Sequence, residues 1–212
     1  MLHIKHYSKG YHGQPPVLEI PELHLPHGLY WLQGENGSGK TTLLKSLAGL
    51  VPFTGSVSVA RTDQQRQPVQ YRRLVSYAEA EPVFPGFATG AELLQFYSRT
   101  KGGIQVKTKE LLQNLGMATW VGNKTSTYSS GMLKKLSLLL AFVGEPQLIL
   151  LDEPLTTLDA AASKTILEHI LLIHRQGASF IITSHQPLDA QVLPYTLLHI
   201  KSANLHQAAA HA

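Results

Sequence analysis

The chain has 212 residues, of which 43% are hydrophobic and 15% charged, and its formal net charge is +4. The length fits one domain with a full core, and the hydrophobic share is ordinary for a globular chain, whereas the charged share is sparse. The chain contains no cysteine, which excludes disulfides, thiolate zinc sites and cysteine nucleophiles. The longest apolar stretch, residues 136–143, is too short to span a bilayer, and the first residues lack the apolar core of a signal peptide. Any membrane role is therefore expected to run through a partner.

The first part of the chain predicts short β-strands separated by glycine and proline turns. Their apolar or alternating runs lie at residues 2–4, 17–20, 23–25 and 29–32.

A glycine-rich segment follows the last of these strands. Residues 34–41 read Gly-Glu-Asn-Gly-Ser-Gly-Lys-Thr and fit the pattern G-x-x-x-x-G-K-[ST], ahead of a predicted helix. Glycines let successive backbone N–H groups surround a phosphate, and the helix start adds the positive end of a dipole. Lys40 then reaches the β- and γ-phosphates, and the Thr41 hydroxyl is a Mg²⁺ ligand. The segment predicts a nucleoside triphosphate site made by Gly34, Asn36, Gly37, Ser38, Gly39, Lys40, Thr41 and Thr42.

The middle of the chain predicts two further strands, a long loop and then helices. The strands are expected at residues 55–59 and 74–77, and the loop, rich in proline and glycine, at residues 78–90. Between residues 91 and 145, apolar residues recur at helical spacing in three segments.

Two later apolar runs, residues 148–151 and 180–183, are continuous rather than alternating. Such runs are typical of strands that are covered on both faces, as in a parallel sheet. A helix is expected between them, a last strand at residues 196–200, and a flexible tail from residue 202 to 212. The sequence therefore predicts an α/β fold with a P-loop NTPase core. Its sheet is mostly parallel, with an antiparallel N-terminal β part and an inserted helical subdomain at about residues 86–145.

Two carboxylates, Asp152 and Glu153, directly follow the run at residues 148–151. Ligands of open α/β sheets bind at the carboxyl ends of the strands, so both side chains are expected to face the bound nucleotide. Asp152 would hold Mg²⁺ through its water shell, and Glu153 would act as general base toward the attacking water. An acidic cap on a strand end is the alternative, and the phosphate-binding segment upstream favours the catalytic interpretation.

Further motifs resemble the ATP-binding subunits of ABC transporters over nearly the whole chain. Leu158-Asp159 follows Glu153 at the distance of that family's D-loop, and His185 follows the strand at residues 180–183 like its switch histidine. Tyr11 lies where the family has its adenine-stacking aromatic residue. Tyr128-Ser129-Ser130-Gly131-Met132 occupies the position of the signature Leu-Ser-Gly-Gly-Gln. By this resemblance the helical subdomain is inserted between the phosphate-binding segment and the signature segment.

The resemblance implies a role for each of these residues. His185 would sense the γ-phosphate, while Ser129 and the Gly131 N–H would meet the γ-phosphate of ATP held by a second subunit, with Asp159 nearby. Each also has a simpler interpretation. Tyr11 could be a strand aromatic on the surface, Asp159 could only cap a helix, and residues 129–131 could be a loop and cap before a leucine-rich helix.

The chain also departs from the family pattern. Ser130 stands where glycine is usual and brings a Cβ into a tight turn, and Met132 replaces glutamine. At the family's Q-loop the simplest alignment gives Ala80, which cannot ligate Mg²⁺ or orient water. Either Glu79 or Glu81 serves with a shift of register, or the site is coupled to its partner differently.

By this resemblance, residues 1–201 form a single ABC-type domain that binds and hydrolyses ATP with Mg²⁺. Two copies would form a head-to-tail homodimer on the cytoplasmic face of the membrane and drive a separate integral membrane subunit. The compact helical insertion and short tail are similar to those of the small exporter-type subunits. No nucleic acid partner is expected.

Three other functions stay open at this point. A soluble ABC-type ATPase that acts on nucleic acid or ribosomes usually has two nucleotide domains or a long coiled coil, and the sequence shows neither. A P-loop kinase or GTPase would leave residues 129–131, Asp159 and His185 unexplained. A hydrolytically silent ATP-binding subunit would be consistent with Ala80 and Ser130.

Overall fold

A ten-stranded sheet forms the centre of the part of the chain that the computed structural model describes, residues 1–10 and 15–211. The strands are β1 (Leu2–Lys9), β2 (Leu18–Leu25), β3 (Leu29–Gly34), β4 (Thr54–Val59), β5 (Thr62–Asp63), β6 (Val75–Ala78), β7 (Leu148–Leu151), β8 (Ser179–Thr183), β9 (Tyr195–Lys201) and β10 (Asn204–His211). The helices are α1 (Lys40–Leu47), α2 (Pro68–Leu74), α3 (Gly90–Lys101), α4 (Val106–Asn114), α5 (Ser130–Ala141) and α6 (Ala160–Arg175), with a 3₁₀ turn at Thr125–Thr127.

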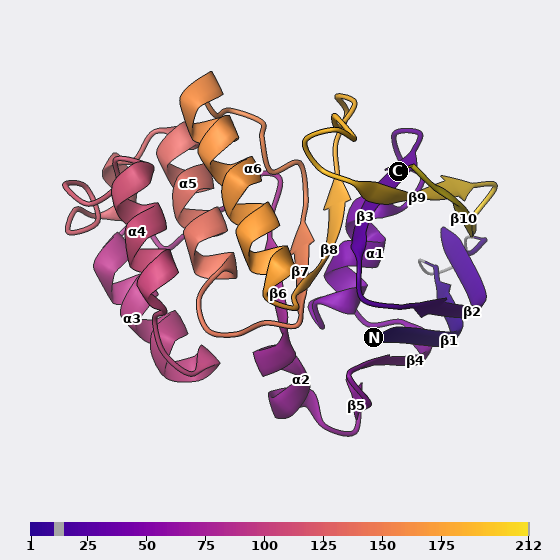
Figure 1. Ribbon diagram of the computed structural model, residues 1–212. Helices are drawn as coiled ribbons and strands as arrows, with labels where there is room; N and C mark the ends of the chain where they lie inside the picture. Colours follow the sequence, from indigo (N-terminus) through magenta and orange to yellow (C-terminus); the bar gives the residue numbers. More distant parts are fainter. Residues whose placement is uncertain (11–14, 212) are drawn as a thin grey trace.

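The sheet has a parallel and an antiparallel part, in the order β5-β4-β1-β2-β10-β9-β3-β8-β7-β6. From β9 to β6 all neighbours are parallel, and β2, β1, β4 and β5 are antiparallel. Figure 1 shows the antiparallel strands on one side of the molecule and α3 to α6 grouped on the other. The predicted α/β fold, with a mostly parallel sheet and an antiparallel N-terminal part, is confirmed.

The parallel strands bury side chains on both faces, as their continuous apolar sequences predict. On β3, Trp31 belongs to a core shared with α5 and α6, whereas Tyr30 and Leu32 belong to a second core shared with α1 and the antiparallel strands. The four residues of β7 are completely buried and divide between the same two cores. Helices therefore cover both faces of the parallel part of the sheet.

Strand β2 differs from the prediction of two short strands interrupted at Pro21. It runs unbroken from Leu18 to Leu25 because its partner strand is irregular at the same place. The ladder pairs Lys5 with Glu22 and Tyr7 with Ile20, and between them His6 has a φ of 50°. Proline donates no N–H to a ladder, so a local break in pairing accommodates it.

The end of the chain also differs from the prediction. Residues 202–212 were expected to form a flexible tail, but β10 pairs antiparallel with β9 through residue 211. Ser202 and Ala203, with φ values of 48° and 58°, make the turn between the two strands. The polar and alanine-rich sequence of β10 has little strand propensity of its own, so pairing with β9 determines its conformation.

The region predicted as a helical subdomain, about residues 86–145, contains α3, α4 and α5. A capping box begins α3, in which the Thr89 hydroxyl accepts from the Glu92 N–H and the Glu92 carboxylate accepts from the Thr89 N–H. Within residues 1–10 and 15–211, no helix has both the length and the apolar character needed to cross a membrane.

Candidate active site

The glycine-rich segment joins the end of β3 to the start of α1, as the strand–loop–helix pattern predicts. A Cβ on Gly34 would lie 2.5 Å from the Ser38 Oγ and 3.0 Å from the Ile200 carbonyl oxygen, so only glycine fits there. Gly39, with a φ of 101°, precedes α1, and no side chain of the described residues caps this helix. The first N–H groups of α1 are therefore available to an anion.

Lys40 extends over the loop that precedes it. Its ammonium donates hydrogen bonds to the carbonyl oxygens of Gly34, at 2.8 Å, and Glu35, at 3.0 Å. A cavity of about 340 Å³ beside the loop is lined by Lys40, His185 and His199. A second cavity, of about 580 Å³, is lined by residues 35–38 and the turn between β9 and β10, and it shares His199 with the first. The loop thus borders two open spaces, one of which contains a cationic side chain.

Asp152 lies just beyond the end of β7 and is only 2% exposed. Its Oδ1 accepts a hydrogen bond from the Thr183 hydroxyl at 2.7 Å, and its Oδ2 accepts one from the Tyr77 hydroxyl at 3.3 Å. Burial and the Asp152 charge raise the pKa of Tyr77 well above its usual value, so the phenol stays protonated and donates. An oriented carboxylate with oxygen donors suits a hard cation such as Mg²⁺.

Glu153 follows with a left-handed backbone, at a φ of 48°. Surrounding hydrogen bonds must hold a non-glycine residue in this conformation. The Glu153 N–H donates to the Thr183 hydroxyl at 3.0 Å, and the His185 N–H donates to the Glu153 Oε2 at 3.1 Å. The Glu153 Oε1 is buried, receives no hydrogen bond from the described residues, and lies 3.7 Å from the His185 Nε2. One carboxylate oxygen is therefore available as a proton acceptor.

The Thr183 hydroxyl was not predicted as a site residue, yet it touches both carboxylate residues. It donates to Asp152 and accepts from Glu153, so one side chain at the end of β8 orients both. The sequence pattern that could have revealed Thr183 is a polar residue that ends a buried apolar run. Tyr77, near the end of β6, was also not predicted, because its partner Asp152 is distant in the sequence.

The signature residues lie apart from these groups. The Ser129 hydroxyl caps α5 by accepting from the Met132 N–H at 3.3 Å, and the Asp159 carboxylate caps α6 by accepting from the Ala162 N–H at 2.7 Å. A Cβ on Gly131 would lie 3.0 Å from the Thr157 carbonyl oxygen, so the start of α5 packs against the loop before α6. Ser129, Gly131 and Asp159 line neither of the two cavities beside the phosphate-binding loop.

Four positions complete the comparison with the predicted site. Ala80 has no polar side chain, while the Glu79 carboxylate lies 4.0 Å from the Lys45 ammonium on α1 and Glu81 is exposed. Tyr11 lies outside the described residues.

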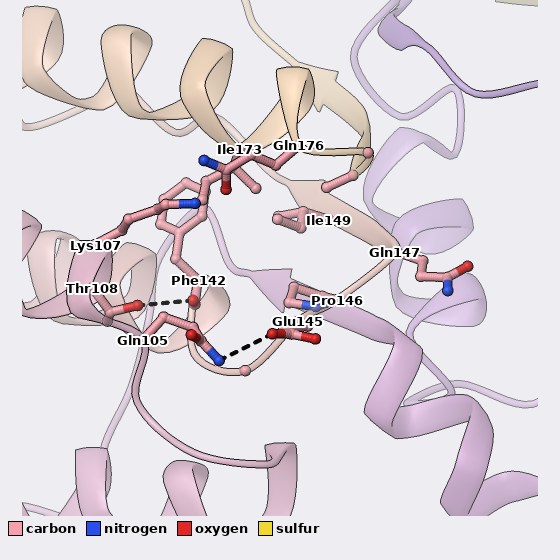
Figure 2. A pocket seen from close by; sticks show the side chains of 13 residues that line it. Gln105, Lys107, Thr108, Phe142, Glu145, Pro146, Gln147, Ile149, Ile173 and Gln176 are labelled. Carbon is pink, nitrogen blue, oxygen red and sulfur yellow. Dashed lines mark hydrogen bonds between the residues drawn. The ribbon is translucent and has the colours of Figure 1, made fainter.

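A further cavity, of about 500 Å³, lies at the amino ends of the parallel strands, opposite to the phosphate-binding loop (Figure 2). Gln105, whose amide donates to the Glu145 carboxylate at 3.3 Å, and Phe142 line it, together with residues at the amino ends of β7 and β8. The phosphate-binding loop, Asp152 and Glu153 follow the carboxyl ends of their strands, so this cavity is separate from the candidate active site.

Comparison with known proteins identifies this arrangement. The profile described as "ABC transporter" matches residues 21–156. The chain belongs to the ABC transporter family. Its similarity to ATP-binding proteins of that family confirms the resemblance inferred from its motifs.

Relatives with curated names agree with this membership. ATP-binding cassette sub-family A member 7 of Rattus norvegicus is 29% identical over 200 residues, which are 91% of this chain and 9% of the rat protein. The ABC transporter ATP-binding protein NatA of Bacillus subtilis is 29% identical over 178 residues, which are 81% of this chain and 72% of NatA. The chain thus spans about a tenth of the large mammalian relatives and most of the bacterial one.

Solved structures share the fold. The ATP-binding subunit of an ABC transporter superposes with a TM-score of 0.88 at 25% identity, covering 98% of this chain and 89% of that one. A dimeric ATP-binding cassette in a post-hydrolysis state with ADP and Pi has a TM-score of 0.83 at 18% identity, with both chains fully covered.

We predict that Thr183→Val lowers ATP turnover by about ten- to a hundredfold, because Asp152 and Glu153 lose the hydroxyl that orients them both. Thr183→Ser keeps that hydroxyl and should stay within a few-fold of the unaltered chain. Steady-state ATP hydrolysis measures the difference. Equal turnover by the valine and serine variants would contradict the role of the hydroxyl.

Proposed function

We propose that this chain is the ATP-hydrolysing subunit of an ABC transporter and that it powers a separate integral membrane subunit. The observation that supports this most directly is the placement of Glu153 beside the cavity lined by Lys40 and His185: its carboxylate accepts from the His185 N–H, and its own N–H donates to the Thr183 hydroxyl. A proton acceptor next to a phosphate-binding loop is the arrangement that hydrolysis of a triphosphate needs.

In this proposal the polar residues divide the steps of hydrolysis among them. Glu153 accepts a proton from the water that attacks the γ-phosphorus, and the bond to the bridging oxygen of ADP breaks as phosphate leaves. Lys40 and the N–H groups at the start of α1 stabilise the charge on the phosphates. His185 hydrogen-bonds the γ-phosphate and holds the Glu153 carboxylate. Asp152 and Thr41 would hold Mg²⁺, which neutralises phosphate charge when bound.

The second half of the site would come from another copy of the chain. Ser129 and Ser130 are exposed at the start of α5, away from the chain's own phosphate-binding loop. A head-to-tail homodimer would bring Ser129, the Gly131 N–H and Asp159 to the ATP of its partner, and Tyr11 would stack on the adenine. Removal of the γ-phosphate then weakens the dimer, because that group bridges the two halves.

The membrane subunit would dock in a groove of about 620 Å³ between α1, α2 and α3. Exposed apolar side chains, Leu50, Val69 and Phe96, lie among Arg72, Arg73 and Arg99. This combination favours a partner segment that is apolar in its centre and acidic at its margins. The chain would accordingly sit in the cytoplasm, peripheral to the membrane, without nucleic acid as a partner.

The concentration dependence of ATP hydrolysis tests the composite site. Turnover should rise faster than linearly with protein concentration, because two copies make each site. Glu153→Gln should lower it by about a hundredfold or more, since the general base is lost, while ATP still holds a dimer of this variant in gel filtration.

Glu145→Gln is the matched control, because it makes the same change at the opposite end of β7 and should leave turnover intact. Turnover strictly linear in concentration would contradict the composite site. ATP binding without any turnover would instead identify a silent subunit, a function that Ala80 and Ser130 would then explain.

Membrane binding of the chain tests the docking groove. Phe96→Asp should lower the membrane-bound fraction of the chain in its own cells by roughly tenfold, because a central apolar contact becomes a charge. Leu172→Asp, at an exposed leucine on α6, is the control and should remain membrane-bound. Equal membrane binding by both variants would exclude the groove as the docking surface.

A further inference from the structure

Lys134 is a buried cation whose hydrogen bonds all go to backbone carbonyl groups. It lies in the second turn of α5 and is 0% exposed. Its ammonium donates to the carbonyl oxygens of Glu79 at 2.8 Å, Ala80 at 3.0 Å and Asp152 at 3.0 Å. A lysine ammonium has three N–H donors, so this set uses its full capacity.

These three contacts join segments that the proposed function assigns to different parts of the reaction. Glu79 and Ala80 begin the loop after β6, where the family resemblance expects a glutamine. Asp152 directly follows β7 and precedes Glu153. Lys134 itself stands five residues after Ser129 on α5, so the helix connects the ammonium rigidly to the signature segment.

The connection is costly to break. Burial lowers the pKa of Lys134 to about 8, while the nearby Asp152 and Glu153 charges act in the opposite direction and favour the ammonium. A buried cation is tolerated only when its donors are satisfied, and separating any one segment would leave a donor and a carbonyl unpaired. The three segments are therefore expected to move together.

We propose that Lys134 is a positioning residue that couples the signature end of α5 to the loop after β6 and to Glu153. This inference rests on the proposed function. It explains how a chain with Ala80 can link its signature segment to the hydrolytic carboxylate: the link runs through backbone carbonyls of the loop and does not require a side chain at position 80. The ATP that a chain binds through residues 34–42 would not depend on it.

Lys101 provides a matched control, because it binds backbone carbonyl groups at the other end of β6. It ends α3, and its ammonium donates to the carbonyl oxygens of Arg72 and Val75 and to the Ser76 hydroxyl. Burial lowers its pKa to about 8 as well. Lys101 thus makes the same kind of contact at the amino end of β6, while Lys134 makes it at the carboxyl end, beside the candidate active site.

The test compares Lys134→Met, Lys134→Arg and Lys101→Met in the full chain, by steady-state kinetics and urea unfolding. We expect Lys134→Met to lower kcat by about ten- to a hundredfold with KM for ATP within a few-fold, because only the positioning of Glu153 changes. Lys134→Arg keeps the charge and several donors and should recover much of kcat. Lys101→Met should lose comparable stability but keep kcat within a few-fold.

Equal loss of kcat in the two methionine variants would overturn the inference and reduce Lys134 to a structural role. So would unchanged kcat in Lys134→Met. If Lys134→Met does not fold, Lys134→Gln, which keeps two N–H donors, is compared with Lys101→Gln by the same criteria. Absence of turnover in the unaltered chain would overturn the proposed function and this inference together, so the two failures are distinguishable.

Discussion

The parallel pairing of β3, β8 and β7 is the constraint on which the candidate active site depends. It brings Gly34, Thr183 and Asp152 to the same end of the strands, although Gly34 lies more than a hundred residues before the other two in the sequence. Both faces of these strands are buried, so a slip in register would expose apolar side chains to water. The hydrophobic core thereby fixes the distances between polar groups that themselves contribute little to folding.

Strand β6 lies at the end of this sheet, and its attachment shows a second physical device. Lys101 and Lys134 donate to carbonyl groups at or beyond its two ends, from α3 and α5 respectively. Carbonyl groups that continue past an edge strand need partners, and a lysine reaches them from a covering helix without a further strand. The helix that carries the signature segment, α5, and its neighbour α3 are in this way tied to the strand that leads to Ala80.

The sequence was sufficient for the elements whose signals are local. Residues 34–41 combine glycine spacing, a preceding strand and a following helix, and the continuous apolar run before Asp152 indicates a buried strand. Thr183, Tyr77 and Lys134 were not predictable in this way, because their partners are distant in sequence and meet them only through the sheet. The unbroken β2 across Pro21, and β10 in place of a flexible tail, depend likewise on neighbouring strands and not on local propensity.

The proposed function requires two copies of the chain to complete each ATP site. An ATP-dependent disulfide between Asn36→Cys of one copy and Ser130→Cys of another, in the Glu153→Gln background, tests this requirement. The chain has no cysteine of its own, so any cross-link reports these two positions. The head-to-tail dimer predicts a covalent dimer with ATP and Mg²⁺ and none in either single-cysteine variant. Failure to cross-link while ATP is bound, or equal cross-linking without ATP, would contradict it.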